Sequence, residues 1–365
     1  MSQVQKLSRQ PVDAAVERKI QLAQYREPSI WKSVWQLLSS ITLFCVLWTV
    51  MLFSLQYSYW LTLLLSVPTA GLMVRLFILQ HDCGHGAFFK SKRLNDVIGF
   101  TLGVLVLTPY GCWRRFHALH HATAGDLDRR GFGDVHTITV AEYLELTRLK
   151  RLGYRLWRNP IIQFGIVPVL HFAVMQRFTY GIPHSWSRER ASIYWTNTFV
   201  FAGGLFVMWL VGPWQFFLVH MPVMFLASSA GVWLFFVQHN FETAYWQRHD
   251  RWEFEMAGLE GSSYYELPRG LQWLTANIGF HHIHHLDSRI PNYRLQECFD
   301  QNSEFRQVHR LTLWQSLSCV SLKLFDEEEG RMVGFQDLDT SRSSLATSGH
   351  PPHLSDSQQC RRKVG

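Results

Sequence analysis

The chain has 365 residues, of which 47% are hydrophobic and 17% are charged, whereas charged residues make up about 25% of an average soluble domain. This composition argues against an ordinary soluble protein. The formal net charge of +7 is modest and no aromatic and basic motif is present, so we expect no nucleic acid partner. The six cysteines have no C-x-x-C spacing, which argues against a disulfide framework and against a zinc ribbon.

Two long stretches of the chain carry no charge. The first 32 residues are polar and lack the features of a cleavable signal peptide. Residues 33–74 and residues 191–241 then contain no Asp, Glu, Lys or Arg. One membrane-spanning helix needs roughly 20 apolar residues, so each stretch predicts two helices joined by a turn, near residues 56–59 and at Gly212-Pro213. The alternative, two buried helical hairpins in a soluble core, does not explain uncharged stretches of this length.

The positions of the basic residues predict the orientation in the membrane. All Lys and Arg lie outside the two uncharged stretches. By the positive-inside rule, both turns then face away from the cytoplasm, while both termini and the rest of the chain face it. We expect an integral multi-pass protein of the plasma (inner) membrane. Arg75 is expected at the cytoplasmic end of the second span, with its side chain directed toward the lipid headgroups.

Two shorter apolar stretches are predicted to enter the membrane without crossing it. Residues 97–113 are interrupted by glycine and proline. At about 1.5 Å per residue they are too short for a ~30 Å hydrocarbon core, so we expect a re-entrant segment. Residues 160–176 contain Pro168 and are flanked by Arg158 and Arg177, which is typical of a helix lying in the membrane interface.

Histidines gather in three short motifs. An H-x-x-x-H motif follows the second span, and two H-x-x-H-H motifs lie further along the chain. Offsets of three and four place side chains on one helix face, about 5 to 6 Å apart, so two imidazoles can approach one cation. The motif histidines are His81, His85, His117, His120, His121, His281, His284 and His285. His282 lies about 100° round the helix from His281 and is not expected to be a ligand.

The number of motif histidines predicts more than one metal ion. All three motifs reach the same membrane surface only if residues 97–113 dip into the bilayer and return. The motif histidines exceed the roughly four to six ligands that one transition metal accepts, so we expect two ions. Zinc performs no redox chemistry, whereas two irons can activate dioxygen.

His239, at the end of the fourth span, is either a ninth ligand or a polar helix cap. His220, within that span, is expected to hydrogen-bond a neighbouring helix.

Other polar residues near the motifs have different predicted roles. Four carboxylates are candidates to accept the second N–H of a ligating imidazole: Asp82, Asp126, Asp128 and Glu242. No ligand role is predicted for His136, His171, His184, His249, His309, His350 and His353. Neither Glu-x-x-His nor His-Glu-x-x-His occurs, which argues against a carboxylate di-iron bundle and against a zinc peptidase.

The spans and motifs together predict an all-α integral membrane protein, with four transmembrane helices in two hairpins and a cytoplasmic helical cap that carries a di-iron site. The motif order resembles that of the membrane fatty acid desaturase family. The stretches HDCGHGAFF, HALHHATAGDLDRRG, GVWLFFVQHNFE and NIGFHHIHH, followed by IPNY, are similar to the acyl-lipid branch that includes omega-6 (delta-12) enzymes. The resemblance covers about residues 33–302.

This resemblance implies a non-haem enzyme with two iron ions (Fe2+/Fe3+). Such an enzyme uses dioxygen and two electrons to leave a cis double bond in the chain of an acyl-lipid substrate. The motif histidines would be the iron ligands, with His239 added at the end of the fourth span. Related enzymes carry an Asn four residues before that histidine, but this chain has Phe235. Gln238 or Asn240 is therefore expected to hold the bridging water instead.

The electrons must come from another protein. The chain has no haem loop, no iron–sulfur cysteine set and no complete G-x-G-x-x-G motif. We therefore expect an external donor of the ferredoxin or cytochrome b5 type. Four basic residues are candidates either to dock such an acidic carrier or to contact lipid headgroups: Arg114, Arg115, Arg129 and Arg130.

Two alternative functions remain open at this stage. A hydroxylase, ketolase or alkane-type monooxygenase would share the three motifs. A metal transporter should carry polar ligands deep in its spans, where only His220 clearly lies. Outside the membrane domain of residues 33–302, we expect cytoplasmic segments at residues 1–32 and 303–336. Residues 337–365 are rich in Ser, Thr, Pro and charge, which predicts a disordered tail.

Overall fold

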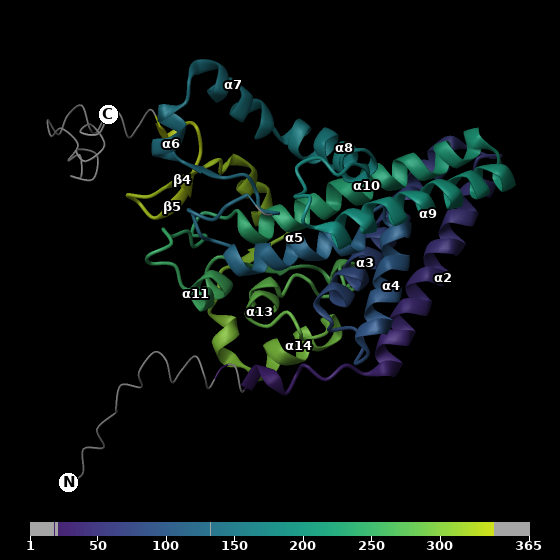
Figure 1. Cartoon of the computed structure of the whole chain (residues 1–365), viewed down its shortest axis with the longest axis horizontal. Helices are drawn as coiled ribbons and strands as arrows, with labels where there is room; N and C mark the ends of the chain where they lie inside the picture. Colours follow the sequence, from purple (N-terminus) through teal and green to yellow (C-terminus); the bar gives the residue numbers. More distant parts are fainter. Residues whose placement is uncertain (1–17, 19–20, 132, 339–365) are drawn as a thin grey trace, which may run out of the picture.

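The computed structural model describes residue 18, residues 21–131 and residues 133–338, which form a mostly helical protein (Figure 1). Four of its helices are long and apolar enough to cross a membrane. They are α2 (Ile30–Ser54), α3 (Tyr59–His85), α9 (Ser187–Val211) and α10 (Pro213–His239). The four predicted spans and both predicted turns are confirmed. Pro213 begins α10, a position where its missing N–H leaves no hydrogen bond unmade.

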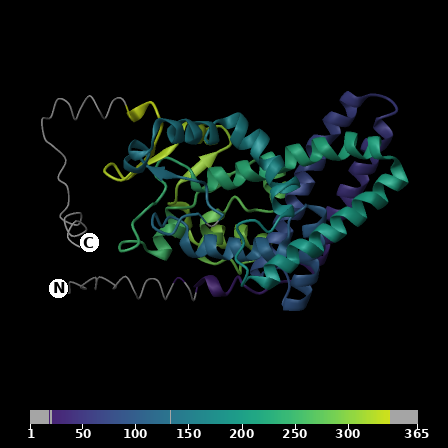
Figure 2. The ribbon, with the colours of Figure 1, turned by 45° about the horizontal axis from the view of Figure 1, so that its top comes forward.

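The two hairpins pack together through α3, which contacts both α2 and α10. Both hairpin tips lie at the same end of the molecule, in Figure 1 and again in the rotated view of Figure 2. α3 is the most buried of the four spans, whereas α2 and α9 expose most of their apolar surface, as helices facing lipid do. Gly86 ends α3 directly after His85 with a φ of 70°, a conformation that glycine adopts without steric cost.

Arg75 does not reach the headgroups from the end of α3, as predicted, but lies within the helix and is only 2% exposed. Its Nε donates to Ser40 Oγ at 2.9 Å, and its Nη1 donates to the carbonyl oxygen of Trp273. The prediction was wrong because α12 (Arg269–Leu274) packs against α3 at this level. The protein itself, and not the lipid surface, therefore satisfies the guanidinium.

The predicted re-entrant segment forms two helices, α4 (Lys92–Leu105) and α5 (Tyr110–Thr123), bent by 103° relative to each other. Leu107 in the turn has a φ of 55°. A close approach of the helices holds the bend, because a Cβ on Gly99 would lie 2.4 Å from the ring of Tyr110. The Tyr110 hydroxyl donates to the carbonyl oxygen of Cys83 in α3 at 2.9 Å. The turn therefore returns α5 to the end of α3, as the dip requires.

Residues 146–182 form an arm that runs along α10 (Figure 1). The arm contains α7 (Arg148–Trp157), the π-helix η1 (Ile162–Ile166), α8 (Val167–Ala173) and the 3-10 turn η2 (Met175–Arg177). The single interfacial helix predicted for residues 160–176 is thus three shorter pieces. Arg158, expected to flank a surface helix, is fully buried and donates to Asn240 Oδ1 at 2.9 Å.

The remaining elements form a cap over the histidine-bearing ends of α3, α5 and α10. Its helical elements are α6 (Val140–Glu145), α11 (Phe254–Leu259), α13 (His281–Leu286), α14 (Asn292–Gln301), η3 (Ser303–Arg306) and η4 (Gln315–Ser321). Five short strands were not predicted: β1 (Ile138–Thr139), β2 (Tyr264–Glu266), β3 (Arg310–Thr312), β4 (Leu324–Asp326) and β5 (Arg331–Val333). β4 pairs with β1 in parallel and with β5 antiparallel, and β2 pairs with β3 in parallel. The mostly helical fold class is confirmed, and these strands add to it.

The end of the described chain is part of this cap. Leu338 belongs to a small apolar core with Tyr143, Tyr154 and Leu324, and Asp337 accepts from the Gly334 amide at 2.6 Å. The disordered tail predicted for residues 337–365 therefore does not begin at Asp337. The rest of that tail lies outside the described residues.

Candidate metal centre

Four helices bring histidines to one point in the cap. α3 ends with His81 and His85, α5 ends with its H-x-x-H-H motif, α10 ends with His239, and the short helix α13 consists largely of the third motif. Offsets of three and four on each helix direct these side chains to a common side. The three motifs, distant in sequence, therefore meet in space.

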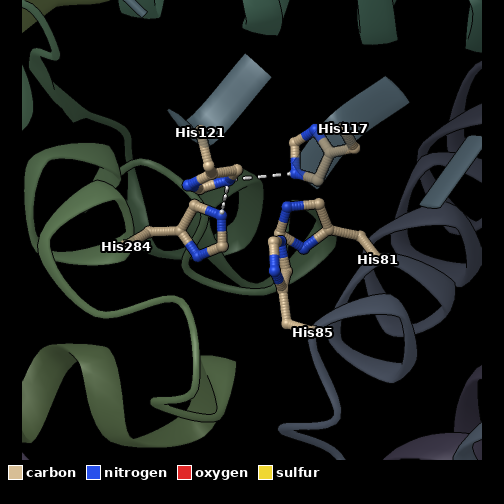
Figure 3. A group of neighbouring side chains, drawn as sticks. All are labelled: His81, His85, His117, His121 and His284. Atoms are coloured by element: carbon tan, nitrogen blue, oxygen red, sulfur yellow. Dashed lines mark hydrogen bonds between the residues drawn. The ribbon is translucent and has the colours of Figure 1, made fainter. Parts of the chain in front are cut away.

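The predicted ligands divide into two groups. In each group, one nitrogen from every imidazole lies within 4.8 Å of the others. The five-histidine group is His81, His85, His117, His121 and His284, and the four-histidine group is His120, His239, His281 and His285. Figure 3 shows the five-histidine group, with rings from α3, α5 and α13 pointing into one space. All nine residues singled out from the sequence lie in these two groups, including His239.

Some ring nitrogens in these groups contact two other imidazoles at once, which hydrogen bonding alone does not satisfy. In the five-histidine group, Nε2 of His121 lies 3.1 Å from Nε2 of His117 and also 3.1 Å from Nε2 of His284. One ring nitrogen carries either a proton or a lone pair, so it cannot make both contacts well. In the four-histidine group, Nε2 of His239 lies 3.2 Å from Nε2 of His120 and 2.9 Å from Nε2 of His281.

The electrostatic surroundings keep these rings neutral. Burial lowers the pKa of His121, His284 and His285 well below the usual value for histidine, and neighbouring imidazoles lower it further. A neutral imidazole keeps one nitrogen lone pair for a metal. Nε2 of both His85 and His285 is buried with no hydrogen-bond partner among the described residues. Crowded, neutral and partly unpaired imidazoles fit transition-metal ions.

Outer contacts determine which ring nitrogen faces each group. Nδ1 of His120 lies 2.6 Å from Asp134 Oδ1, and Nδ1 of His239 lies 3.1 Å from the carbonyl oxygen of Gly261. Both acceptors favour a proton on Nδ1, which leaves the Nε2 lone pair directed into the four-histidine group. Asp134 was not predicted, because it lies in a loop without a fixed offset from the second motif.

Asp82 is the predicted carboxylate that lies beside a motif histidine. Its Oδ1 is 3.4 Å from Nδ1 of His81, and its Oδ2 accepts from both the backbone amide and Nδ2 of Asn292 at 2.8 Å. Asn292 belongs to the IPNY stretch that follows the third motif, so this carboxylate links the first motif to the third. The role of IPNY in this link was not predicted.

The other three candidate carboxylates bind elsewhere, and their predicted role was wrong. Asp126 accepts from Arg129 and contacts His249, Asp128 accepts from Arg248, and Glu242 accepts from Arg331. Each of these partners is a surface cation or a histidine outside both groups. These carboxylates follow the histidine-bearing helices α5 and α10 closely in sequence, but the fold directs them to other partners.

The expected substitutes for the family's asparagine have other partners. Gln238 donates through Nε2 to the carbonyl oxygen of Ile278 at 2.8 Å, although it also lines the adjacent cavity. Asn240 accepts from the buried Arg158 and donates to the carbonyl oxygens of Cys319 and Leu322. The ring of Phe235 lies 5.1 Å from the rings of both His120 and His239. An apolar ring therefore occupies the position where the resemblance implies a polar side chain.

The histidines without a predicted ligand role stay outside both groups where the structure describes them. His309 stacks on Phe241 at 4.5 Å, and His171 lies 2.9 Å from Nε2 of Gln176. His220 stacks on Phe216 of its own helix at 5.0 Å, so the expected bond to a neighbouring helix is not seen among the described residues. His350 and His353 lie outside the described residues.

A cavity of about 510 Å³ opens beside the histidine groups. It lies between α3, α5, α8 and α10 and reaches His81, His117 and His281. Its walls are mainly apolar and include Met73, Phe77, Phe172, Met224 and Ala227. A concave, mostly apolar site of this kind suits the hydrocarbon tail of a lipid.

The four arginines proposed for carrier docking are each paired within the chain. Their carboxylate partners lie 2.5 to 3.0 Å away. The pairs are Arg114 with Asp96, Arg115 with Glu189, Arg129 with Asp126, and Arg130 with Glu142. Their charges are therefore largely balanced inside the protein, which weakens the case for a basic docking face at these positions.

Comparison with known proteins agrees with this geometry. The sequence model of the family described as "Fatty acid desaturase" matches residues 58–317. A "Fatty acid desaturase" of Bacillus subtilis (strain 168) is 40% identical over 94% of this chain and 96% of that protein. In Synechocystis sp. (strain ATCC 27184 / PCC 6803 / Kazusa), an "sn-1 acyl-lipid omega-3 desaturase (ferredoxin)" is 30% identical over 61% of this chain and 62% of its own length. An "sn-1 oleoyl-lipid 12-desaturase" from the same organism is 25% identical over 72% and 75%. The chain, with its membrane helices and paired histidine groups, belongs to the fatty acid desaturase family.

Proposed function

We propose that the two histidine groups hold two iron ions, Fe2+ or Fe3+, one ion to each group. The observation that carries this proposal is the division of nine imidazoles into a set of five and a set of four, in each of which one nitrogen per imidazole lies within 4.8 Å of the others. Iron accepts imidazole nitrogen, and both groups stay within its usual ligand number. The proposed ligands are His81, His85, His117, His120, His121, His239, His281, His284 and His285.

The proposed substrate is the acyl chain of a membrane lipid. Bound iron supplies the oxidising power to break an unactivated C–H bond, which side-chain acids and bases cannot do. The mainly apolar cavity holds the chain against His81, His117 and His281, which line it. One dioxygen, two electrons and two protons are consumed as two hydrogens leave adjacent methylenes, which gives a cis double bond and two waters. The names of the Synechocystis relatives as acyl-lipid desaturases support this substrate class.

The proposed electron donor is an external carrier of the ferredoxin or cytochrome b5 type. Two relatives carry ferredoxin in their printed names. The sequence contains no haem loop and no cysteine set for an iron–sulfur cluster. Electrons therefore enter from the cap side, where the histidine groups lie.

The proposed topology places the cap in the cytoplasm. Both hairpin tips lie at the end of the molecule opposite the cap (Figures 1 and 2), and basic residues lie outside the two uncharged stretches. By the positive-inside rule, both termini and the metal centre are cytoplasmic, and we propose the plasma (inner) membrane as the location. Residues 1–32 and 303–336 then flank a membrane domain of residues 33–302.

Replacing a ligand histidine tests the metal assignment. We expect His284→Ala to abolish desaturation and to lower the iron content of the purified protein, because the five-histidine group loses one nitrogen. His309→Ala is the matched control, since His309 stacks on Phe241 outside both groups. Iron is measured by elemental analysis, and products by gas chromatography with mass spectrometry of fatty acids from an expressing host.

Two results would overturn the proposal. One is a fully active His284→Ala enzyme, and the other is an active protein that contains zinc and no iron. A new hydroxyl or keto group in place of a double bond would assign the chain to a related oxygenase activity.

A further inference from the structure

The arm carries an unusual concentration of uncompensated positive charge. Residues 146–182 contain no Asp or Glu. They contain six basic residues, which are Arg148, Lys150, Arg151, Arg155, Arg158 and Arg177. A segment of this composition favours contact with an anionic surface.

The basic residues of α7 differ in their partners from the basic residues of neighbouring elements. The four arginines first considered for docking all have carboxylate partners at 2.5 to 3.0 Å. By contrast, α7 shows no ion pair to a described carboxylate. Arg151 donates to the carbonyl oxygens of Tyr143 and Leu144, and Arg155 donates to the Tyr143 hydroxyl at 2.7 Å. Arg148 and Lys150 are exposed. Four basic side chains without an ion pair to a described carboxylate therefore lie together on α7.

The same helix exposes an apolar stripe. Leu149, Leu152 and Leu156 stand three and four residues apart on one face and are 79%, 53% and 50% exposed. The opposite face carries Tyr154, which is 6% exposed and belongs to the cap core. The outer face therefore combines large apolar side chains with cations, as in helices that lie in a membrane interface.

The stripe continues into the part of the arm beside the membrane helices. Ile161, Ile166 and Leu170 are 75%, 51% and 48% exposed, and η1 and α8 pack against α10. The mouth of the cavity follows immediately. Phe178 and Tyr180 line the cavity and are 63% and 97% exposed, so the cavity opens to the surface at this end of the arm. The elements η1, α8 and η2 thus connect α7 to the mouth of the cavity.

We propose that α7 is a binding surface for anionic phospholipid, which seats the arm in the headgroup layer and orients the cavity mouth toward the bilayer. The inference rests on the membrane placement in the proposed function. The partner is a lipid surface and not an acidic protein, because an exposed row of leucines matches acyl chains while the flanking cations match phosphates. Anionic lipid then becomes a requirement for efficient entry of the substrate chain.

The first test measures binding without catalysis. A fluorophore sensitive to polarity is attached at Leu149→Cys in the full-length protein, which is reconstituted in phosphatidylcholine vesicles with increasing phosphatidylglycerol. We expect a blue shift that saturates with the anionic fraction. In an Arg148→Gln, Lys150→Gln background, the apparent affinity for phosphatidylglycerol should fall by about 30-fold, since each basic residue near an anionic surface contributes roughly fivefold. A shift that is independent of phosphatidylglycerol overturns the proposal.

The second test measures the effect on the reaction. The same double variant should have a raised KM for the lipid substrate in phosphatidylglycerol vesicles, with kcat and iron content unchanged. Arg251→Gln, Arg306→Gln is the matched control, because it removes two exposed cap cations outside the arm. If a small chemical reductant restores the double variant to the wild-type rate, α7 docks the electron carrier and the proposal is wrong. If the protein contains no iron, the activity test fails but the lipid-binding test still applies. Failure of the metal assignment can therefore be distinguished from failure of this inference.

Discussion

At the scale of single residues, the contact between His120 and Asp134 shows how a carboxylate from a loop orients a proposed metal ligand. Asp134 Oδ1 lies 2.6 Å from His120 Nδ1, and its Oδ2 accepts from the Gly131 amide at 3.2 Å. The carboxylate is 6% exposed, so little water competes for it. The carboxylate therefore fixes the ring orientation of His120 and increases the basicity of Nε2.

Removing this carboxylate charge should weaken metal retention. We expect Asp134→Asn to lower the affinity for iron by about 10- to 100-fold, as found for similar partners of metal-bound histidines. The measurement is the iron left in purified protein after dialysis against increasing chelator. Asp128→Asn is the control, because Asp128 is a surface carboxylate paired with Arg248. Equal iron loss in both variants would show that Asp134 has no special role.

Offsets along the chain predicted which histidines lie together, but they did not predict the residues that support them. His81 and His85, or His117 and His121, share a helix face by their spacing alone. Asp134 and Asn292 reach the centre only through tertiary packing, which no local pattern encodes. The prediction for Arg75 was wrong for the same reason, since its partners Ser40 and Trp273 come from separate helices.

At the scale of elements, the bend between α4 and α5 places the second motif beside the first. The bend depends on the close packing of α4 against the turn. A Cβ on Gly103 would lie 2.5 Å from the backbone oxygen of Thr108, which cannot rotate away as a side chain would. Glycine and proline in this stretch correctly predicted an interrupted segment, but the 103° angle follows from contacts between the two helices.

Filling this contact should destabilise the protein. We expect Gly103→Ala to cost about 1–3 kcal/mol, the usual range for overpacking, and to lower Tm. Gly203→Ala in α9 is the matched control, because nothing lies within 4 Å of a Cβ at that position. Thermal unfolding in detergent, followed by circular dichroism, compares the two variants. An unchanged Tm for Gly103→Ala would mean that the turn adapts easily.

At the scale of the whole molecule, the two hairpins and the cap form a protein with one catalytic side. The lack of charge in residues 33–74 and 191–241 predicted all four spans, because burial in lipid excludes charged side chains. The short strands of the cap were not predictable in this way. β4 and β5, for example, have three residues each, and β4 pairs with β1 from far along the chain.

The orientation can be measured in intact cells. Tyr57 at the tip between α2 and α3 is 82% exposed, and Asp250 in the cap is exposed as well. We expect a membrane-impermeant maleimide to label Tyr57→Cys from outside, and to label Asp250→Cys only after the cells are opened. The wild-type chain provides the background. Labelling of Asp250→Cys in sealed cells would reverse the proposed topology.

The distribution of the motif histidines over two groups also has a consequence for biogenesis. Each group takes at least one imidazole from α13, and α13 is among the last helices to leave the ribosome. With iron bound as proposed, a nascent chain that has already inserted all four spans still lacks part of the ligand set for either ion. We therefore expect iron delivery to be a late maturation step, and a chain truncated before His281 to enter the bilayer yet stay inactive.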